Sequence, residues 1–131
     1  MHIIIGGAHN GKRGYVNTML AGREVEWFEG VIPKYSEARQ VMVVAGIEKW
    51  LAETDLSEAD AVDYVLAAVA DRDVIVVLTD IGRGIVPIDA QQRKLRDTCG
   101  RLYQRLMVEA DEVTRIWYGL AQTLKKRGEV V

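Results

Sequence analysis

Three short runs of apolar residues, rich in valine and isoleucine, constrain this chain more than any other feature. They are "HIII" at 2–5, "VMVVA" at 41–45 and "DVIVVLT" at 73–79. None of them alternates between apolar and polar residues, which is typical of strands buried on both faces of a parallel sheet. Helical patterns alternate with the runs, so the sequence predicts strand–helix–strand units with right-handed crossovers.

Helices are expected at four places, and several carry recognisable capping residues. The first, over 11–21, precedes Gly22, a typical residue just beyond a helix end. Ser57, followed three residues later by Asp60, predicts an N-terminal capping box, and Asp89 is the predicted N-cap of a long final helix. The apolar faces of these last two helices are expected to consist of Val62, Val65, Leu66 and Val69, and of Leu95, Cys99, Leu102 and Leu106.

The remaining segments carry weaker signals. Residues 46–53 suit a short helix, whereas 23–40 combine mixed charge with a proline and no clean period, so we expect mostly loop there. Residues 112–119 predict a fourth strand, followed by a polar tail. A chain of 131 residues is long enough for one domain with a substantial core, but not for two. We therefore expect a single domain over 1–131.

Composition excludes several classes of protein. The net charge is −2, so bulk nucleic-acid binding is not expected and any anion site must be local. No apolar run approaches the ~18 residues of a membrane helix, and the first residues lack the basic region and cleavage site of a signal peptide. The single cysteine, Cys99, excludes an internal disulfide and indicates a reducing compartment. We expect a cytoplasmic protein that binds neither membrane nor nucleic acid.

The segment "GGAHNGK" at 6–12 joins the first strand to the first helix. Its Gly-x-x-x-x-Gly-Lys spacing is typical of a phosphate-binding loop, in which several N–H groups converge on an anion at the positive end of a helix. Lys12 adds a full charge for the β- and γ-phosphates. The alternative is a strand–helix turn that happens to contain glycine and lysine. The residues expected at a phosphate site are Gly6, Gly7, Ala8, His9, Asn10, Gly11, Lys12 and Arg13.

Two positions near this loop bear on its chemistry. Phosphate-binding loops usually place a magnesium-binding Ser or Thr after the lysine, but here the residue is Arg13. The Arg13 guanidinium either reaches phosphate or lies solvated along the helix. Asp80 follows the third buried strand, so it belongs to the same edge of the sheet. Its carboxylate suits orientation of magnesium or of a substrate hydroxyl, or else caps a turn. Lys12 and Asp80 are the candidate catalytic residues.

The segment 78–113 carries a specific family resemblance. It contains "TDIGRGIVP" at 79–87, followed in register by Arg93, Leu95-Arg96-Asp97, Gly100, Tyr103-Gln104 and Ala110-Asp111-Glu112-Val113. Together with the opening "GGAHNGK" and the closing "GLAQTLK", it resembles the bifunctional adenosylcobinamide kinase / adenosylcobinamide-phosphate guanylyltransferase family of cobalamin biosynthesis. The resemblance implies an α/β, P-loop NTPase-like fold with a mostly parallel sheet flanked by helices, and a homotrimer. It also implies GTP or ATP with Mg²⁺, and an adenosylcobinamide-type corrinoid that is phosphorylated before GMP is attached through a histidine.

Three features depart from the family pattern. Arg13 replaces the loop hydroxyl, and Ala45 stands where members end the middle strand with a carboxylate, so two usual magnesium ligands are missing. Glu48 is close by and can substitute. The guanylyl-accepting histidine has no counterpart in 22–40, because the chain contains only His2 and His9. His2 opens a strand, whereas His9 is a nucleophile, a phosphate donor or a loop-packing residue.

The shortened segment 23–40 also contains Trp27, Phe28 and Tyr35, which would cover a corrin ring or a base, or form a lid or subunit contact. We expect a nucleotide-dependent transferase of the cobinamide kinase/guanylyltransferase type, with guanylyl transfer through histidine weak or absent. The alternative is a non-catalytic paralogue that binds nucleotide or corrinoid, or that assembles with a partner.

Overall fold

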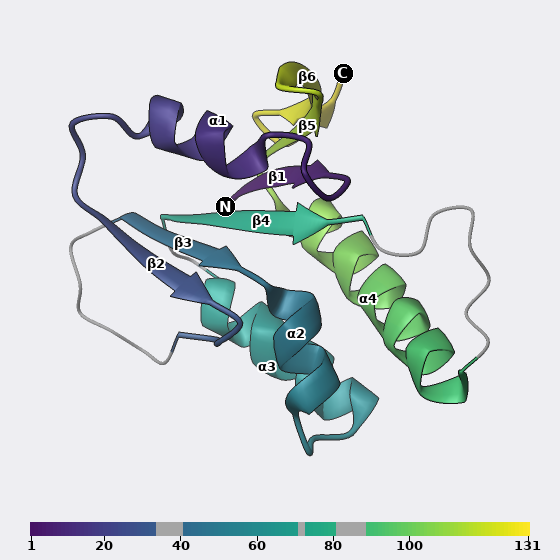
Figure 1. Ribbon diagram of the computed structural model, residues 1–131. Coiled ribbons are helices and arrows are strands. Elements are labelled where there is room, and N and C mark those ends of the chain that lie inside the picture. Colours follow the sequence, from purple (N-terminus) through teal and green to yellow (C-terminus); the bar gives the residue numbers. More distant parts are fainter. Residues whose placement is uncertain (34–40, 71–72, 81–88) are drawn as a thin grey trace.

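The computed structural model describes residues 1–33, 41–70, 73–80 and 89–131 (Figure 1). The first half of the chain contains β1 (His2–Gly6), α1 (Lys12–Met19), β2 (Val25–Glu29), β3 (Val41–Ala45), α2 (Ile47–Glu53) and α3 (Glu58–Val69). The second half contains β4 (Val74–Thr79), α4 (Ala90–Glu109), β5 (Glu112–Trp117), β6 (Leu120–Lys126) and β7 (Glu129–Val130).

All of these strands belong to one sheet, in the order β2-β3-β4-β1-β5-β6-β7. The first five strands of that order are parallel, and β6 and β7 are antiparallel. The predicted mostly parallel α/β sheet is therefore confirmed. β1 lies between β4 and β5, and its last residue, Gly6, is in register with Thr79 at the end of β4. The segments that leave β1 and β4 consequently begin side by side at the carboxyl edge of the sheet.

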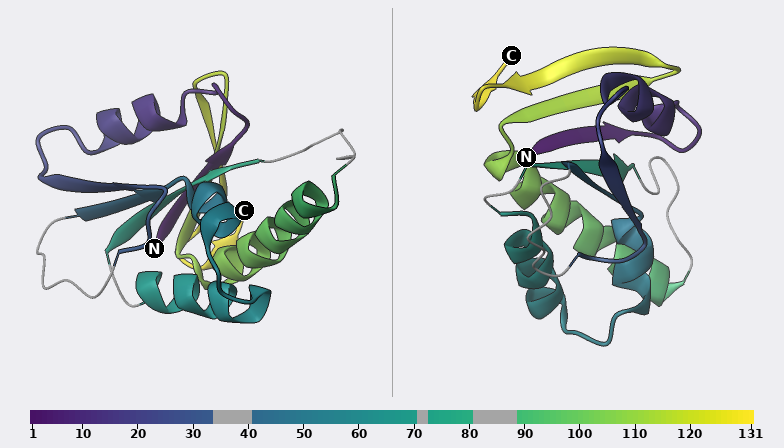
Figure 2. Two further views of the ribbon diagram at one scale, coloured as in Figure 1. Left: turned by 60° about the horizontal axis from the view of Figure 1, so that its bottom comes forward. Right: turned by 90° about the vertical axis from the view of Figure 1, so that its left-hand side faces the viewer.

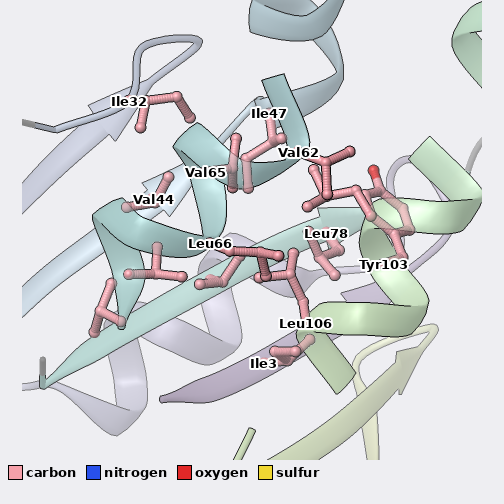
Figure 3. Packing of buried hydrophobic residues seen from close by; sticks show 14 of the residues in the cluster. Ile3, Ile32, Val44, Ile47, Val62, Val65, Leu66, Leu78, Tyr103 and Leu106 are labelled. Carbon is pink, nitrogen blue, oxygen red and sulfur yellow. The ribbon is translucent and has the colours of Figure 1, made fainter. Parts of the chain in front are cut away.

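Helices cover the two faces of the sheet unequally (Figures 1 and 2). α1 lies on one face, where Val16 and Leu20 join a cluster with alternate residues of the central strands. α2, α3 and α4 pack on the other face and enclose the larger core (Figure 3). Ile3, Leu102 and Leu106 in that core are fully buried. Removing such large apolar side chains from water is the main favourable contribution to folding.

The predicted helix limits and faces agree closely with the structure. The Ser57 hydroxyl accepts a hydrogen bond from the Asp60 N–H, and the Asp89 carboxylate accepts one from the Gln91 N–H. Ala70 and Ala110, the C-cap residues of α3 and α4, satisfy the last turns through N–H bonds to Leu66 and Leu106. All the predicted apolar positions of α3 are buried, as are Cys99, Leu102 and Leu106 of α4, and Leu95 packs against the same core.

The expectation of mostly loop over 23–40 is wrong for its first part, because 25–29 form β2. Among the strands of the described residues, β2 lies at one end of the sheet and pairs with β3 alone. An end strand keeps charged residues on its exposed positions, which removes the continuous apolar run that identified the other strands. Trp27 and Phe28 lie on this strand and are half-buried, whereas Tyr35 is outside the described residues.

The polar tail expected after 119 is also incorrect, because it forms β6 and β7. Two tight turns make these pairings. Tyr118 and Gly119 both have positive φ, at 50° and 77°, and Arg127 and Gly128 repeat the pattern at 53° and 79°. Two consecutive positive φ angles are the geometry of the commonest two-residue hairpin turn, in which glycine is favoured. The sequence therefore indicated these hairpins only by Gly119 and Gly128, at the second position of each turn. The flanking residues are mostly polar, so they do not form an apolar run typical of a buried strand.

Candidate functional site

The phosphate-loop motif lies at the carboxyl edge of β1, where Gly6 ends the strand and Lys12 begins α1. Gly6 has no room for a side chain, because a Cβ there would lie 2.4 Å from the Ile116 carbonyl oxygen of β5. Gly11 precedes the helix with φ +89°, a conformation that L side chains rarely adopt. No side chain of the described residues caps this helix. Its first N–H groups therefore face the loop with their positive end.

Lys12 is the best-buried charged residue of the loop, with 8% of its surface exposed. Its Nζ donates hydrogen bonds to the carbonyl oxygens of Gly6 and Gly7, at 3.0 and 2.6 Å. Burial lowers the pKa of Lys12 and the nearby Arg13 guanidinium adds to this, whereas the carboxylates of Glu48 and Asp80 act in the opposite direction. The ammonium group is thus held inside the loop by backbone carbonyls, with two carboxylates in range.

Asp80 is the first residue after β4, and its N–H donates to the Gly6 carbonyl oxygen at 2.9 Å. This bond joins the segment after β4 to the phosphate loop, so Asp80 lies at the edge of the sheet that its position after a buried strand predicted. The side chain of Asp80 is exposed at the edge of the sheet, and its charge acts on Lys12. The rest of this segment, including Gly82 and Gly84, is outside the described residues.

Glu48 is a second carboxylate at the same edge. It is the second residue of α2, which begins just after β3 ends. Its Oε2 is inaccessible to solvent and has no hydrogen-bond partner among the described residues. The charge of Glu48 acts on Lys12. Burial raises the pKa of Cys99 to about 11, and the charge of Glu48 adds to this effect. The sequence indicated this residue only by its place, three residues beyond Ala45 at the end of a central strand.

Arg13 turns toward the neighbouring strand rather than along the helix. Its guanidinium makes a two-pronged ion pair with the Glu29 carboxylate of β2. It also lies over the Trp27 ring, with its Cζ 5.9 Å from the ring centroid. In this arrangement Arg13 joins α1 to the end strand of the sheet. A direct bond from Arg13 to phosphate would require the ion pair to open.

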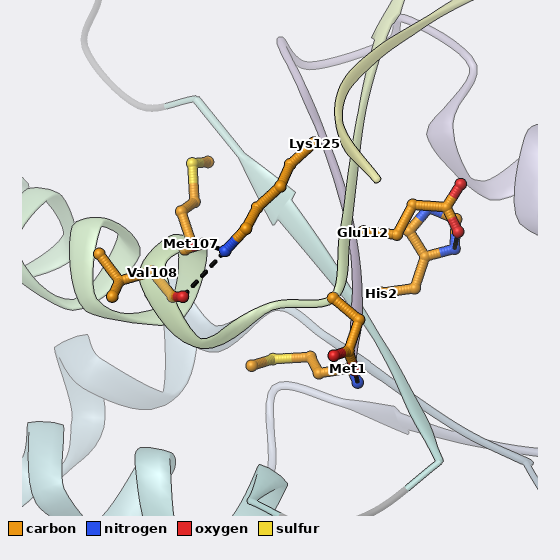
Figure 4. Close-up of polar contacts among 7 residues, drawn as sticks. Met1, His2, Met107, Val108, Glu112 and Lys125 are labelled. Carbon is orange, nitrogen blue, oxygen red and sulfur yellow. Dashed lines mark hydrogen bonds and ion pairs between the residues drawn. The ribbon is translucent and has the colours of Figure 1, made fainter. Parts of the chain in front are cut away.

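The two histidines lie at different edges of the sheet. His9 is exposed in the phosphate loop, with φ +61°. His2 begins β1, where its Nε2 lies 2.8 Å from the Thr114 hydroxyl. Its Nδ1 lies 3.7 Å from the Glu112 carboxylate, and Figure 4 shows these two side chains next to each other. Burial lowers the pKa of His2, although Glu112 raises it and the terminal ammonium lowers it further. His2 thus lies at the end of β1 opposite to the phosphate loop.

A cavity of about 580 Å³ opens beside the phosphate loop, on the side of β5. Its polar lining comes from the loop and from the ends of β4 and β5, and its apolar lining comes from β1, α4, β5 and β6. The residues that line it are Ile5, Gly6, Gly7, Asn10, Asp80, Met107, Arg115, Ile116, Trp117 and Leu124. Sequence reasoning placed Arg115 and Trp117 on a strand but gave them no functional role, because their position beside the loop depends on the pairing of β1 with β5.

A second cavity of about 460 Å³ lies in the helical layer. It is bounded by α2, by the start of α3 and by the first half of α4, including Leu51, Leu56, Gln91, Leu95 and Thr98.

The residues that the structure describes contain no group of three or more His, Cys, Asp or Glu side chains placed to hold a metal ion by themselves. None of the helices in the described ranges is both long and apolar enough to cross a membrane.

Two comparisons with known proteins identify relatives of this chain. The bifunctional adenosylcobalamin biosynthesis protein CobU of Salmonella typhimurium (strain LT2) is 33% identical over 81 residues, which cover 60% of this chain and 45% of that relative. The match therefore spans less than half the length of the relative. Residues 23–124 match the sequence model of a family described as cobinamide kinase / cobinamide phosphate guanyltransferase. That range excludes the 6–12 loop. The chain belongs to the cobinamide kinase / cobinamide phosphate guanyltransferase family.

Proposed function

We propose that this protein is a nucleotide-dependent transferase of cobalamin biosynthesis. It binds GTP or ATP at the 6–12 loop and transfers the γ-phosphoryl group to a hydroxyl of an adenosylcobinamide-type corrinoid. The single observation that carries the proposal is the buried Lys12 ammonium at the start of α1, inside a glycine loop at the carboxyl edge of the sheet. Family membership supplies the class of substrate.

Phosphate binding would use groups that the loop already directs to one place. The uncapped N–H groups at the start of α1 would donate to the phosphate oxygens. Lys12 would exchange the Gly6 and Gly7 carbonyl oxygens for the β- and γ-phosphate oxygens, which are stronger acceptors because they are charged. Phosphoryl transfer depends mainly on such positioning and charge stabilisation.

Magnesium would be held by carboxylates rather than by a loop hydroxyl. The Arg13 side chain has no oxygen to bind a metal ion. The Glu48 Oε2, which has no hydrogen-bond partner among the described residues, and the Asp80 carboxylate both interact electrostatically with the Lys12 ammonium. One or two carboxylates together with substrate phosphates are a common set of magnesium ligands. The ion, when bound, neutralises charge on the β- and γ-phosphates. We therefore propose Asp80 and Glu48 as its protein ligands, with Asp80 also able to orient the acceptor hydroxyl.

This proposal does not include guanylyl transfer through a histidine of the protein. His2 lies at the amino edge of β1, and His9 belongs to the loop that would surround the β- and γ-phosphates. A covalent route needs an imidazole nitrogen free to attack the α-phosphate. We expect no GMP–protein adduct by intact-mass spectrometry after incubation with GTP and magnesium. A stoichiometric adduct that disappears in His9→Ala would restore the bifunctional reaction.

A non-catalytic paralogue is the second candidate. It is favoured by the ion pair that holds Arg13 where the loop hydroxyl is usual, and by Ala45 in place of a carboxylate. Such a protein would bind nucleotide or corrinoid, or a partner subunit, without turnover.

We also propose a cytoplasmic location, which is consistent with the free and buried thiol of Cys99.

We further propose a homotrimer. Exposed apolar side chains on the last hairpins, including Tyr118, Leu120 and Val130, would support association. A monomer found by light scattering at tens of micromolar would contradict the trimer.

The deciding experiment is a product assay. Purified protein is incubated with labelled GTP or ATP, magnesium and adenosylcobinamide, and the corrinoid products are separated. Phosphorylated corrinoid that depends on Lys12 supports the kinase, and GDP-linked corrinoid would extend it to guanylyl transfer. Nucleotide binding without either product would favour the non-catalytic paralogue. An absence of nucleotide binding would overturn the proposed use of the loop.

A further inference from the structure

We propose that the cavity between the phosphate loop and the β5–β6 hairpin is the nucleoside subsite. This inference rests on the proposed function, because it assigns the base and ribose of the nucleotide whose phosphates the loop would hold. The cavity shares Gly6, Gly7 and Asn10 with the loop, and it continues away from the loop toward β5. Its volume of about 580 Å³ lies within the usual 300–1,000 Å³ of small-molecule sites.

The wall of the cavity has the chemistry that recognises a flat heteroaromatic ring. Trp117 ends β5 with 57% of its surface exposed, although indole rings gain most by burial. The Arg115 guanidinium lies over the same ring, with its Cζ 5.7 Å from the ring centroid. A tryptophan paired with an arginine presents a planar, cationic surface, and nucleobases stack on both kinds of group.

Other lining residues suit the remaining parts of a nucleoside. Leu124 and Met107 provide an apolar floor, and they pack against the larger core. Asn10 and Asp80 are at the end of the cavity that the loop shares, where a ribose would lie between base and phosphates. An amide and a carboxylate are suitable partners for ribose hydroxyl groups. The cavity thus changes from polar near the loop to aromatic and apolar near β5.

A hydrogen bond fixes the hairpin against the loop. The Gly119 N–H in the β5–β6 turn donates to the Asn10 carbonyl oxygen at 2.8 Å. The fit is close, since a Cβ on Gly11 would lie 3.4 Å from the Gly119 Cα. Because the turn of the hairpin is held on the phosphate loop, a nucleotide spanning the two would meet a preorganised surface. Preorganisation reduces the ordering cost of binding.

Calorimetry with two kinds of ligand separates this inference from the proposed function. GTP, ATP and inorganic tripolyphosphate are titrated into the wild-type protein, Trp117→Ala and Lys12→Ala. Stacking on one aromatic residue contributes about 1–3 kcal/mol, so Trp117→Ala should weaken binding of at least one nucleotide about 5- to 150-fold while tripolyphosphate binding is unchanged. Lys12→Ala should weaken both kinds of ligand. Gln122→Ala is the matched control, because Gln122 pairs with Arg115 across the same hairpin but is not among the lining residues of the cavity.

A fluorescence measurement covers the case in which Trp117→Ala is poorly folded. The chain has three tryptophans, so replacing Trp27 and Trp50 by phenylalanine leaves Trp117 as the sole reporter. GTP or ATP should quench its emission, and tripolyphosphate should not.

Each alternative result has a distinct meaning. Nucleotide binding that is unchanged in Trp117→Ala, or unquenched Trp117 at nucleotide saturation, would overturn the subsite and leave the proposed function intact. Equal losses of nucleotide and tripolyphosphate in Trp117→Ala would also overturn it, because the effect would then be on the loop. Loss of cobinamide binding alone would assign the cavity to the acceptor instead. Failure of the wild-type protein to bind any nucleotide would overturn both proposals.

Discussion

Lysine ammonium groups bond to pairs of backbone carbonyls at both edges of the sheet, but the two environments differ. At the amino edge, Lys125 of β6 donates to the carbonyl oxygens of Met107 and Val108, at 3.0 and 2.9 Å (Figure 4). Those carbonyls belong to the last turn of α4, where the helix dipole favours a cation. At the carboxyl edge, Lys12 is the first residue of α1, where the same dipole disfavours a cation and favours an anion.

This difference distinguishes a charge placed for stability from one placed for binding. Lys125 completes a helix end, as a C-terminal basic residue commonly does. Lys12 is buried beside the positive end of a helix, and burial lowers its pKa. An anion in the loop would remove that conflict, whereas no ligand is needed at the amino edge. Departures from local consistency of this kind are expected at functional sites.

The largest expected effect comes from replacing Lys12 and Lys125 by alanine, each in a separate variant. Lys12→Ala should weaken nucleotide binding by roughly 1.5–3 kcal/mol, the contribution of a hydrogen bond to a charged group, with a smaller change in the free energy of unfolding. Lys125→Ala should leave binding unchanged and lower the free energy of unfolding by about 0.3–1 kcal/mol. Calorimetry and urea denaturation measure the two quantities. Equal losses of nucleotide affinity in both variants would remove the distinction between the edges.

A pair of glycine substitutions tests how strictly the loop is positioned. Gly6→Ala places a Cβ 2.4 Å from the Ile116 carbonyl oxygen, so β1 and β5 must separate slightly. We expect a loss of about 1–3 kcal/mol in the free energy of unfolding, the usual cost of overpacking. Gly14→Ala in α1 is the control, because no atom of the described residues lies within 4 Å of the added Cβ. This substitution should stabilise the helix by about 0.5–1 kcal/mol. Denaturant midpoints that fall equally in both would contradict the packing argument.

Glu48→Gln tests whether an orphaned carboxylate serves chemistry rather than folding. Its Oε2 is buried without a partner among the described residues, so removal of the charge should not destabilise the fold. Phosphorylation of the corrinoid should nevertheless fall tenfold or more, equivalent to about 1.4 kcal/mol of transition-state stabilisation. Turnover measured over a range of magnesium concentrations should show a higher requirement in the variant. Wild-type turnover with a normal magnesium dependence would exclude Glu48 from the site.

The features that could be predicted from the sequence are those determined by neighbours along the chain. Buried strands β1, β3 and β4, the caps at Ser57 and Asp89, and the glycine loop all follow from local pattern. β2 was missed because an end strand needs no continuous apolar run, and its pairing with β3 is absent from local signals. The cavity beside the loop depends on the order of the strands, which brings Trp117 close to Asn10. Residues that approach through the sheet cannot be recognised before its topology is known.

The smallest expected effect is at the amino edge of the sheet. Replacing His2 tests whether this residue makes the free energy of unfolding depend on pH. Burial lowers the pKa of His2 below its ordinary value of 6.5. Below pH 6.5 the unfolded chain therefore takes up a proton that the folded chain does not, so the free energy of unfolding declines as the pH falls through the folded pKa. The stabilising contribution of the neutral His2 side chain to the free energy of unfolding is therefore fully present above pH 6.5. His2→Gln should flatten this part of the profile, measured by urea denaturation between pH 7.5 and about 5.

Asp111 does not obscure this measurement. The terminal ammonium donates a hydrogen bond to this carboxylate and pairs with its charge. Both effects lower the pKa of Asp111 below its ordinary 3.8, so its titration affects stability only in more acidic solutions. Nucleotide affinity in His2→Gln should match the wild type at each pH, because the ring lies at the opposite end of β1 from the loop. A profile for His2→Gln that declines as steeply as the wild type would show that other groups account for the acid sensitivity. A change in nucleotide affinity would instead mean that the two edges are coupled through β1.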